Sequence, residues 1–575
     1  AFYNNSYLEE IDLSNCTNLT RIEDGAFENC INLKKVILPD SVVSIGKNAF
    51  RGCTKLESSN NTQILNLKNV TYIGPNAFNG CSGTEFKTIN LPSTLVTLGT
   101  QAFYNCENLE AITIPESVTQ VGDATFYGCL HLTQARIYNK TLSAEEFSQC
   151  TSLASVTLNN EITVIPEKCF KNSTCTNLYR TIGADEENPD GNDTIQGFPL
   201  NLAIIKEEAF YGSSILKVNL PDATKTVGNS AFEACKAITT VDLNKITSLG
   251  ERSFANCAST SLTQITIPET LVDSTEENGN TVFAIGSHAF AKSVYINSAT
   301  INNHQFGEYM FEGCSSLSNI KFNQLSQITE VAEGTFKDCT ALESVTIPAG
   351  ITEVRANAFD GCTKLTNITF ENDKIGDYMF ANCTSLYTIT IPTNITSIGE
   401  HAFDGCTALG TVVNGVKGTI NNESKIWSNY MFANCTGLTT ITIENANKDK
   451  LGGYVFYKDS ALTEIYYISD VISEHMFDSC ISLQNVYFKL NGSEPLVKTI
   501  KNNAFENCQS LASITIPSST TTVEDEVFKD CLKLATVEIA KEIQSLGQGL
   551  LYGCKKLVSL TIPSVSYTHL RAHET

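Results

Sequence analysis

The chain has 575 residues, of which 42% are hydrophobic and only 18% charged, and its formal net charge is -23. Such an acidic chain has no basic face with which to displace counterions from phosphates, so we expect neither nucleic acid nor an anionic membrane as a partner. It has no run of 18 apolar residues, and we therefore predict no membrane insertion of this fragment.

One pattern recurs from the first residues to Pro563. Its anchor is a phenylalanine followed three residues later by a cysteine, as in Phe27 and Cys30. Counted from Phe2 to Leu551, the anchor occurs 23 times at spacings of 21 to 40 residues, with 23 the commonest spacing. A fixed period with apolar positions in constant phase is typical of a solenoid, whose coils bury their apolar side chains against their neighbours.

Each coil has the same order of residue types. In the coil that contains Ile112 and Ile114, these two residues point to one side of a short strand and Thr113 to the other. Pro115 then ends the strand because proline has no N–H to donate. A glycine four residues before the anchor, such as Gly122, indicates a backbone position with φ > 0 or a tight corner. We predict a β-rich repeat solenoid with short parallel strands and short helical or irregular return segments.

The coils are regular up to Phe170 and are then interrupted by two acidic, turn-rich segments. The first runs from Ala184 to Thr194 and the second from Asp273 to Asn280. The first does not match the ligand spacing of an EF-hand calcium loop, so we predict surface loops in both places. Loops inserted at one point of a repeat often mark where a solenoid binds its ligand.

Eighteen of the 21 cysteines occupy the slot three residues after the anchor. Zinc-binding cysteines come in close pairs with a matching second pair, which is not found here, so we predict no metal and no cofactor. Two arrangements remain, a ladder of buried thiols or disulfides between successive coils. We favour thiols because Ser213 and Ser293 take the slot in two coils without disturbing the period.

The outward strand position is occupied by threonine in nine coils and by tyrosine in two later ones. Threonine suits an exposed strand, and it could also form a hydroxyl-rich surface for a glycan. The tyrosines and the single tryptophan could anchor a protein or sugar ligand, or could simply pack across strands. The candidate ligand-binding residues are Tyr466, Tyr487, Trp427, Thr346, Thr369, Thr390 and Thr442.

We find no catalytic motif, neither H-E-x-x-H nor G-x-S-x-G nor a P-loop, and we predict no enzymatic activity and no catalytic residues. His288, His401 and His475 fall one or two residues before an anchor, where we expect variable positions facing solvent.

The ends of the chain break the repeat. Ala1 and Phe2 begin in the middle of a coil without a polar cap, so we expect one elongated domain, residues 1–563, that is truncated at its N-terminus. Residues 564–575 lose the period, and we expect this tail not to be native.

The segment from Ile112 to Val118, ITIPESV, followed by Val121 and Gly122, and the AFYNC segment from Ala102 to Cys106 resemble the BspA-like class of leucine-rich repeats. The resemblance covers about residues 1–563 and implies a right-handed, curved solenoid on secreted or surface-attached proteins of bacteria and certain protists. The class is associated with adhesion to host proteins, matrix and other cells. We therefore expect an extracellular or cell-surface binding protein that is not an enzyme. It should recognise proteins or glycoproteins, including matrix or glycans, through its concave sheet and projecting loops. The alternative is a structural spacer that displays a domain missing from this fragment.

Overall fold

A computed structural model describes residues 1–58, 65–182, 194–271, 276–277, 280–281, 284–323, 328–413, 415–489 and 494–561. The two predicted acidic loops and the tail from Ser564 lie largely or wholly outside these ranges. The chain forms two compact units. The first comprises Ala1–Met310 with Ile320–Asn323, and the second Phe311–Asn319 with Gln324–Thr575. A single domain over residues 1–563 stays a prediction.

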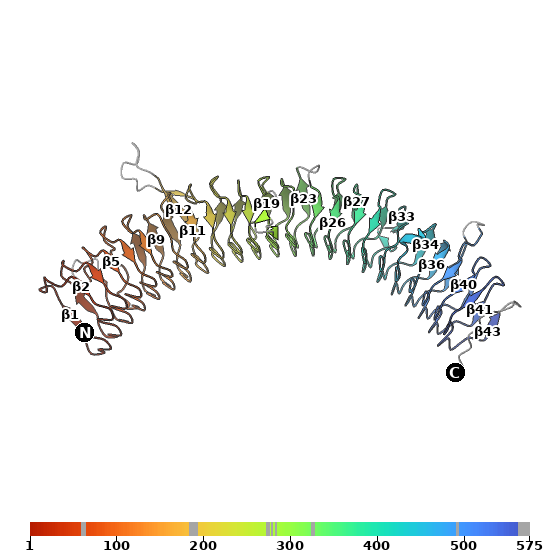
Figure 1. Cartoon of the computed structure of the whole chain (residues 1–575), viewed down its shortest axis with the longest axis horizontal. Coiled ribbons are helices and arrows are strands. Elements are labelled where there is room, and N and C mark those ends of the chain that lie inside the picture. The colour runs from red at the N-terminus through yellow and green to blue at the C-terminus, as the bar shows by residue number, and fades with distance from the viewer. Residues whose placement is uncertain are drawn as a thin grey trace. The chain divides into compact units, whose positions relative to one another are not determined.

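Both units are repeat solenoids, in which turn follows turn in chain order (Figure 1). Most coils carry a longer strand at the L-x-x-I-x-I segment, as predicted, and a two-residue strand before the glycine, which was not predicted. Both strands pair in parallel with their equivalents in the adjacent coils.

In the first unit the longer strands and one antiparallel addition, β13, are β1 (Glu10–Asp12), β3 (Lys35–Ile37), β7 (Ala111–Ile114), β9 (Gln134–Ile137), β10 (Ser155–Leu158), β12 (Asn177–Thr181), β13 (Thr194–Gln196), β15 (Lys217–Asn219), β17 (Thr240–Asp242), β19 (Gln264–Ile267), β22 (Ser298–Ile301) and β23 (Asn319–Phe322). The two-residue strands are β2 (Arg21–Ile22), β4 (Ser44–Ile45), β5 (Tyr72–Ile73), β6 (Thr97–Leu98), β8 (Gln120–Val121), β11 (Val164–Ile165), β14 (Ile204–Ile205), β16 (Thr226–Val227), β18 (Ser248–Leu249) and the hairpin β20 (Glu276–Glu277) with β21 (Asn280–Thr281).

In the second unit the longer strands are β25 (Ser344–Ile347), β27 (Asn367–Phe370), β29 (Ile389–Ile391), β33 (Ile420–Asn422), β34 (Thr440–Glu444), β35 (Glu464–Ile468), β37 (Asn485–Tyr487), β39 (Ser513–Thr515), β41 (Thr536–Glu538) and β43 (Ser559–Thr561). The two-residue strands are β24 (Glu330–Val331), β26 (Glu353–Val354), β28 (Lys374–Ile375), β30 (Ser397–Ile398), β36 (Val471–Ile472), β38 (Thr499–Ile500), β40 (Thr522–Val523), β42 (Ser545–Leu546) and the hairpin β31 (Val412–Val413) with β32 (Val416–Lys417).

The return segments consist of turns rather than helix. Within the described ranges, helix is confined to the 3-10 turn η2 (Lys448–Lys450). This part of the chain therefore contains no helix long and apolar enough to cross a membrane.

The core of each unit is a stack of the anchor rings. The anchor side chains from Phe27 to Phe528 are buried. Phe27 and Phe50 in adjacent coils lie with ring centroids 5.2 Å apart and planes 4° from parallel, and Phe505 and Phe528 lie 5.7 Å apart. Because the anchor rings within each unit contact the equivalent ring of the next coil, the phenylalanine spacing predicted from the sequence is also the spacing of the core.

The cysteines form the ladder of free thiols that we favoured, and all 21 are unpaired with one another. The thiol of Cys53 donates a hydrogen bond to the carbonyl oxygen of Phe27 in the preceding coil at 3.1 Å, and the thiol of Cys531 does the same to Phe505 at 3.2 Å. Burial raises the pKa of Cys53 to about 12. These thiols therefore pack as small apolar groups in the core, and Cys53 stays protonated at neutral pH.

The glycine before the anchor is required by the close approach of adjacent coils and not by a positive φ, which was one of our two expectations. Gly122 does not have a positive φ. A Cβ atom there would lie 2.1 Å from the backbone nitrogen of Thr100 in the preceding coil. The left-handed positions lie on either side of the anchor instead, as at Asn48 (φ 55°) and Gly52 (φ 73°) around Phe50.

Candidate functional site

The outward positions of the longer strands in the second unit carry four of the predicted ligand-binding threonines. Thr346 on β25 lies opposite Thr369 on β27, and both are exposed. Thr390 on β29 is also exposed and lies opposite Asn421 on β33. The strand alternation therefore places these hydroxyls on the surface, as the sequence predicted.

The remaining threonine of the prediction lies beside the two tyrosines. Thr442 on β34, Tyr466 on β35 and Tyr487 on β37 are directly opposite one another in register. The rings of Tyr466 and Tyr487 stack with centroids 4.8 Å apart and planes 19° from parallel. Tyr487 is 39% exposed, and Tyr466 is half-buried. The two rings thus pack across strands and still present polar edges beside a threonine.

One outward threonine does not face solvent. Thr157 on β10 is only 7% exposed. It lies between Arg136 on β9 and Tyr179 on β12, whose longer side chains flank it on both sides. The expectation of an exposed hydroxyl is therefore wrong at this position.

The exposure expected of Trp427 is also wrong. Its side chain is 2% exposed and packs against the anchor rings Phe432 and Phe456, at centroid distances of 6.1 Å and 5.7 Å. Trp427 lies five residues before its anchor, which is the slot of the buried Ile45 in another coil. Alignment on the anchor would have placed this tryptophan in the core.

A row of aromatic side chains two residues before the anchor was missed. In five successive coils of the second unit these rings stack face to face, with neighbouring centroids 4.3 to 4.5 Å apart and planes within 9° of parallel. The row consists of Tyr378, His401, Tyr430, Tyr454 and His475.

Backbone geometry aligns this row. All five residues have positive φ, between 50° and 57°. The N–H of His401 donates to the carbonyl of Asn429 in the next coil at 3.0 Å, and the N–H of His475 does so to Asn502 at 3.0 Å. His401 and His475 are half-buried rather than freely exposed, which corrects our expectation of variable solvent positions. The recurrence of Tyr or His at one slot was the signal for this row.

His401 and His475 each form a hydrogen bond with the aspartate that lies one residue after the anchor of the same coil. His475 Nδ1 lies 2.8 Å from Asp478 Oδ2, and His401 Nδ1 lies 2.7 Å from Asp404 Oδ2. Burial raises the pKa of Asp478, although its hydrogen bond from His475 opposes this shift. The aromatic row therefore ends at a partly buried polar group.

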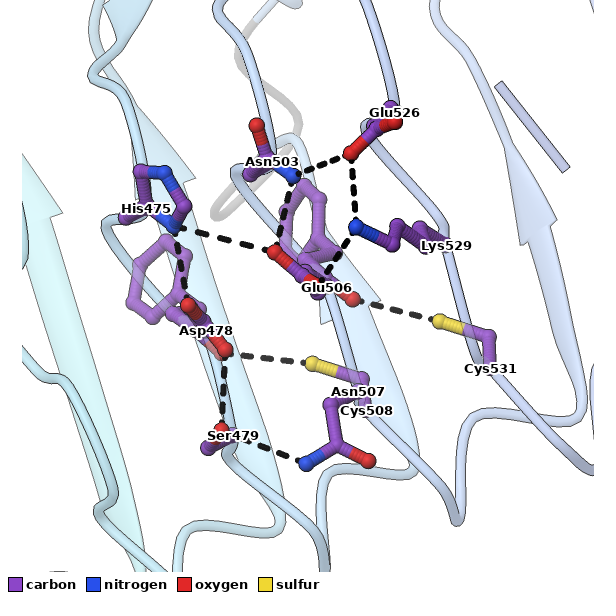
Figure 2. Close-up of polar contacts among 12 residues, drawn as sticks. His475, Asp478, Ser479, Asn503, Glu506, Asn507, Cys508, Glu526, Lys529 and Cys531 are labelled. Carbon is purple, nitrogen blue, oxygen red and sulfur yellow. Dashed lines mark hydrogen bonds and ion pairs between the residues drawn. The ribbon is translucent and has the colours of Figure 1, made fainter. Parts of the chain in front are cut away.

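Figure 2 shows how that group continues across the next two coils. Glu506 Oε2 lies 3.9 Å from His475 Nδ1, and Glu506 Oε1 lies 3.3 Å from Lys529 Nζ. Lys529 Nζ also lies 2.8 Å from Glu526 Oε2. Asn503 Nδ2 donates to Glu506 Oε2 at 2.7 Å. Polar side-chain atoms from three adjacent coils are thus brought to one place.

The cluster contains three side chains of the types that bind metal ions. One ligand atom each of His475, Asp478 and Glu506 lies within 4.8 Å of the others. Glu506 is already neutralised by Lys529 and accepts a hydrogen bond from Asn503 at the oxygen nearest the histidine. The residues present therefore satisfy one another, and Lys529 supplies the positive charge that a metal ion would bring.

Comparison with known protein families agrees with this geometry. The family described as "BspA type Leucine rich repeat region (6 copies)" matches residues 1–82, 57–179, 194–284, 283–410, 373–495 and 472–573. The chain belongs to this BspA-type leucine-rich repeat family. The match accounts for the repeated coil in both units.

Several solved structures are similar to this BspA-type chain. A leucine-rich repeat protein from Bacteroides ovatus is 21% identical, with 82% of this chain and 86% of that one covered and a TM-score of 0.34. A leucine-rich cell surface protein from Faecalibacterium prausnitzii is 24% identical, with 60% and 85% covered and a TM-score of 0.33. The pneumococcal vaccine antigen PcpA is 19% identical, with 52% and 77% covered and a TM-score of 0.35. No curated protein matches the sequence.

Proposed function

We propose that this BspA-type repeat chain is the binding part of a secreted or cell-surface adhesion protein. It holds a protein or glycoprotein ligand, such as a matrix component, on the outward face of its longer strands. The observation that carries the proposal is the row formed by Thr442, Tyr466 and Tyr487, in which stacked rings and a hydroxyl group share one surface.

Stacked tyrosines suit such a role for a physical reason. Tyrosine has few rotatable bonds, so its contact area costs little conformational entropy when a ligand binds. The ring contact between Tyr466 and Tyr487 restrains both side chains further before binding. The phenol groups supply hydrogen bonds at the edge of an apolar surface.

The negative charge near Tyr466 limits the class of ligand that this face can bind. Glu464 precedes Tyr466 on β35 by two residues and so lies on the same face, where it is half-buried. The chain as a whole carries a net charge of -23. We therefore favour a ligand with a neutral or basic contact surface over an acidic one.

The proposed role does not involve catalysis. The ladder thiols are buried, and burial raises the pKa of Cys53 and Cys150 to about 12, so neither supplies a ready thiolate. The side chains of the polar cluster around His475 are hydrogen-bonded or ion-paired with one another.

The experiment is a binding screen on an array of matrix proteins and glycans, followed by affinity measurements on two paired variants. Tyr466→Ala with Tyr487→Ala should weaken the selected ligand about tenfold or more, because large aromatic side chains dominate most binding surfaces.

The matched control is Tyr104→Ala with Tyr127→Ala, which removes another tyrosine stack of 4.8 Å that lies beside the anchors and not on the longer strands. Equal weakening by both pairs, or full affinity of the Tyr466 and Tyr487 variant, would contradict the proposed face. A chain that binds nothing on the array would favour the spacer role.

A further inference from the structure

The row of longer strands in the first unit is interrupted after β12. The strand β13 pairs with β12 in antiparallel orientation, with Tyr179 opposite Gln196. The carbonyl oxygen of Leu178 accepts a hydrogen bond from the N–H of Gly197 at 2.9 Å. In the regular parallel ladder this carbonyl would accept from the outward residue of the next coil, Asn219. The added strand therefore separates β12 from β15.

A buried phenylalanine holds this separation in place. Phe198 follows Gly197 directly, is 2% exposed and meets the anchor ring of Phe210 edge-on, with centroids 6.0 Å apart and planes at 85°. Phe198 thus fixes the end of β13 and Gly197 to the core. The described residues that border the gap between the two coils on this side are therefore packed against the core.

The gap is a cavity of about 180 Å³. Its floor includes Leu178 and Phe198, and its polar lining includes Asn177, Arg180, Gln196, Lys217 and Asn219. Gln196 Nε2 donates to Asn177 Oδ1 at 2.6 Å, which orients these two amides beside the cavity. Two cations and several amides therefore surround a small apolar floor.

The charge of this lining is opposite to that of the chain. The chain has 62 acidic and 39 basic residues, yet no aspartate or glutamate lines the cavity. Within the described ranges, neither Arg180 nor Lys217 makes an ion pair, whereas Arg51 and Arg252 pair with glutamates. Among the described residues, the guanidinium of Arg180 makes one long hydrogen bond, from Nη1 to the carbonyl oxygen of Phe198 at 3.4 Å. Most N–H groups of this guanidinium therefore have no partner within that part of the chain.

We propose that this cavity binds a carboxylate group of a small ligand. The guanidinium of Arg180 and the ammonium of Lys217 supply the counter-charge, and the amides of Asn177 and Asn219 supply further hydrogen bonds. A guanidinium suits a carboxylate because its parallel N–H groups match the two oxygens. The volume fits the acidic end of a sugar or of an amino-acid side chain.

One nearby carboxylate of the chain should repel the carboxylate of the ligand. Asp242 on β17 lies opposite Asn219 on β15. It is exposed and lies outside the lining of the cavity. Removal of its charge by Asp242→Asn should strengthen binding at low ionic strength, because repulsion of the ligand carboxylate is lost.

The test is a ligand-observed NMR titration of the full chain with two carboxylates, glucuronate and the α-methylamide of N-acetylaspartate. Their uncharged counterparts are glucose and the α-methylamide of N-acetylasparagine. We expect both carboxylates to bind and both neutral compounds to bind about tenfold more weakly. The tighter of the two carboxylates identifies a sugar or a peptide as the source of the group.

Variants distinguish the cavity from the rest of the surface. Arg180→Gln and Lys217→Gln should each weaken binding about tenfold. Arg136→Gln is the matched control, because Arg136 is an exposed arginine on β9 of the same sheet. Thermal unfolding checks that each variant is folded. Equal binding of the neutral compounds, or equal loss in the Arg136 variant, would overturn the proposal.

The chain's own acidic groups need a separate control. Residues 183–193 contain five carboxylates, at Asp185, Glu186, Glu187, Asp190 and Asp193. The titration is therefore repeated on a variant in which all five are amides. If neither the parent chain nor this variant binds either carboxylate at millimolar concentration, the proposed site is rejected. The proposed adhesive face lies in the other unit, so its own test is unaffected by this result.

Discussion

Asp459 occupies the thiol position of the cysteine ladder, and its Oδ1 accepts a hydrogen bond from the backbone N–H of Cys435 at 2.8 Å. The residue is fully buried, and Oδ2 has no hydrogen-bond partner. Burial therefore raises the pKa of Asp459 well above its ordinary value. In most other coils this slot holds a thiol that donates to the preceding anchor carbonyl, which an ionised carboxylate is unable to do.

The first prediction concerns stability against pH. Folding raises the pKa of this carboxyl group above its unfolded value, which is near 4. At a pH below about 4 the group is protonated in both states, so it does not lower the free energy of unfolding. As the pH rises towards the folded pKa, the free energy of unfolding should fall by about 1.4 kcal/mol per pH unit. Asp459→Cys restores the ladder and removes this loss. We expect the variant to unfold at a higher temperature than the parent at pH 8, with a smaller difference at pH 4. A difference independent of pH would contradict the buried, neutral carboxyl.

The second prediction concerns the ring stack. Phe359 lies between Phe336 and Phe380, at centroid distances of 5.2 Å and 5.5 Å, and is 2% exposed. Phe359→Ala should cost about 3 to 5 kcal/mol through lost burial and the cavity that remains. Coils contact only their neighbours, so hydrogen exchange should accelerate near this coil and not near Phe505. Unchanged exchange around Phe359 would show that the assigned register is wrong.

The third prediction separates two uses of glycine. Gly122→Ala brings a Cβ atom to 2.1 Å from the nitrogen of Thr100, so the backbone of two coils must move. Gly80 has a φ of 73° but meets no atom closer than 3.9 Å. Gly80→Ala should cost about 1 kcal/mol for the left-handed backbone. Chemical denaturation should show a larger loss for Gly122→Ala, and the reverse order would contradict the close approach of the coils.

The fourth prediction concerns thiol reactivity. Cys16 is exposed and Cys554 is partly exposed, whereas the other cysteines are buried. Burial also raises the pKa of Cys150 and Cys175 to about 12. Alkylation of the native chain, read by mass spectrometry, should label Cys16 first and Cys554 more slowly, and denaturation should expose the rest. Disulfides between neighbouring coils in the peptide map would contradict the thiol ladder.

Much of the core could be predicted because one residue type recurs in one slot. The spacing of Phe359 and Cys362 from their equivalents was enough to place both in the interior, where they are found. The same alignment would have placed Trp427 correctly, because it falls in the slot of Ile45. We chose Trp427 as a ligand-binding candidate because it is the single tryptophan, but its position in the repeat determines that it is buried.

The recurrence of Tyr or His two residues before the anchor could have indicated an aromatic row, but neither the stacking of that row nor the cavity could be predicted in this way. The left-handed backbone at Tyr378 and His401 is held by hydrogen bonds to the following coil, and a single coil gives no sign of them. The cavity beside Arg180 depends on Gly197 replacing Asn219 as donor to Leu178. That replacement arises from an inserted strand, whose pairing partner the repeat pattern does not specify.

The anchor contacts also bear on how such a chain changes its length during evolution. Phe27, Phe50 and Phe78 each meet the same slot of the adjacent coil, with centroid distances of 5.2 and 5.3 Å. A recombination event that duplicates or deletes one whole coil would therefore join surfaces that already match. The number of coils can therefore change without selection of a new core. An insertion within a coil preserves the stack only if the added residues leave the anchor slots in place, as they do between Phe170 and Phe210, whose rings lie 5.0 Å apart.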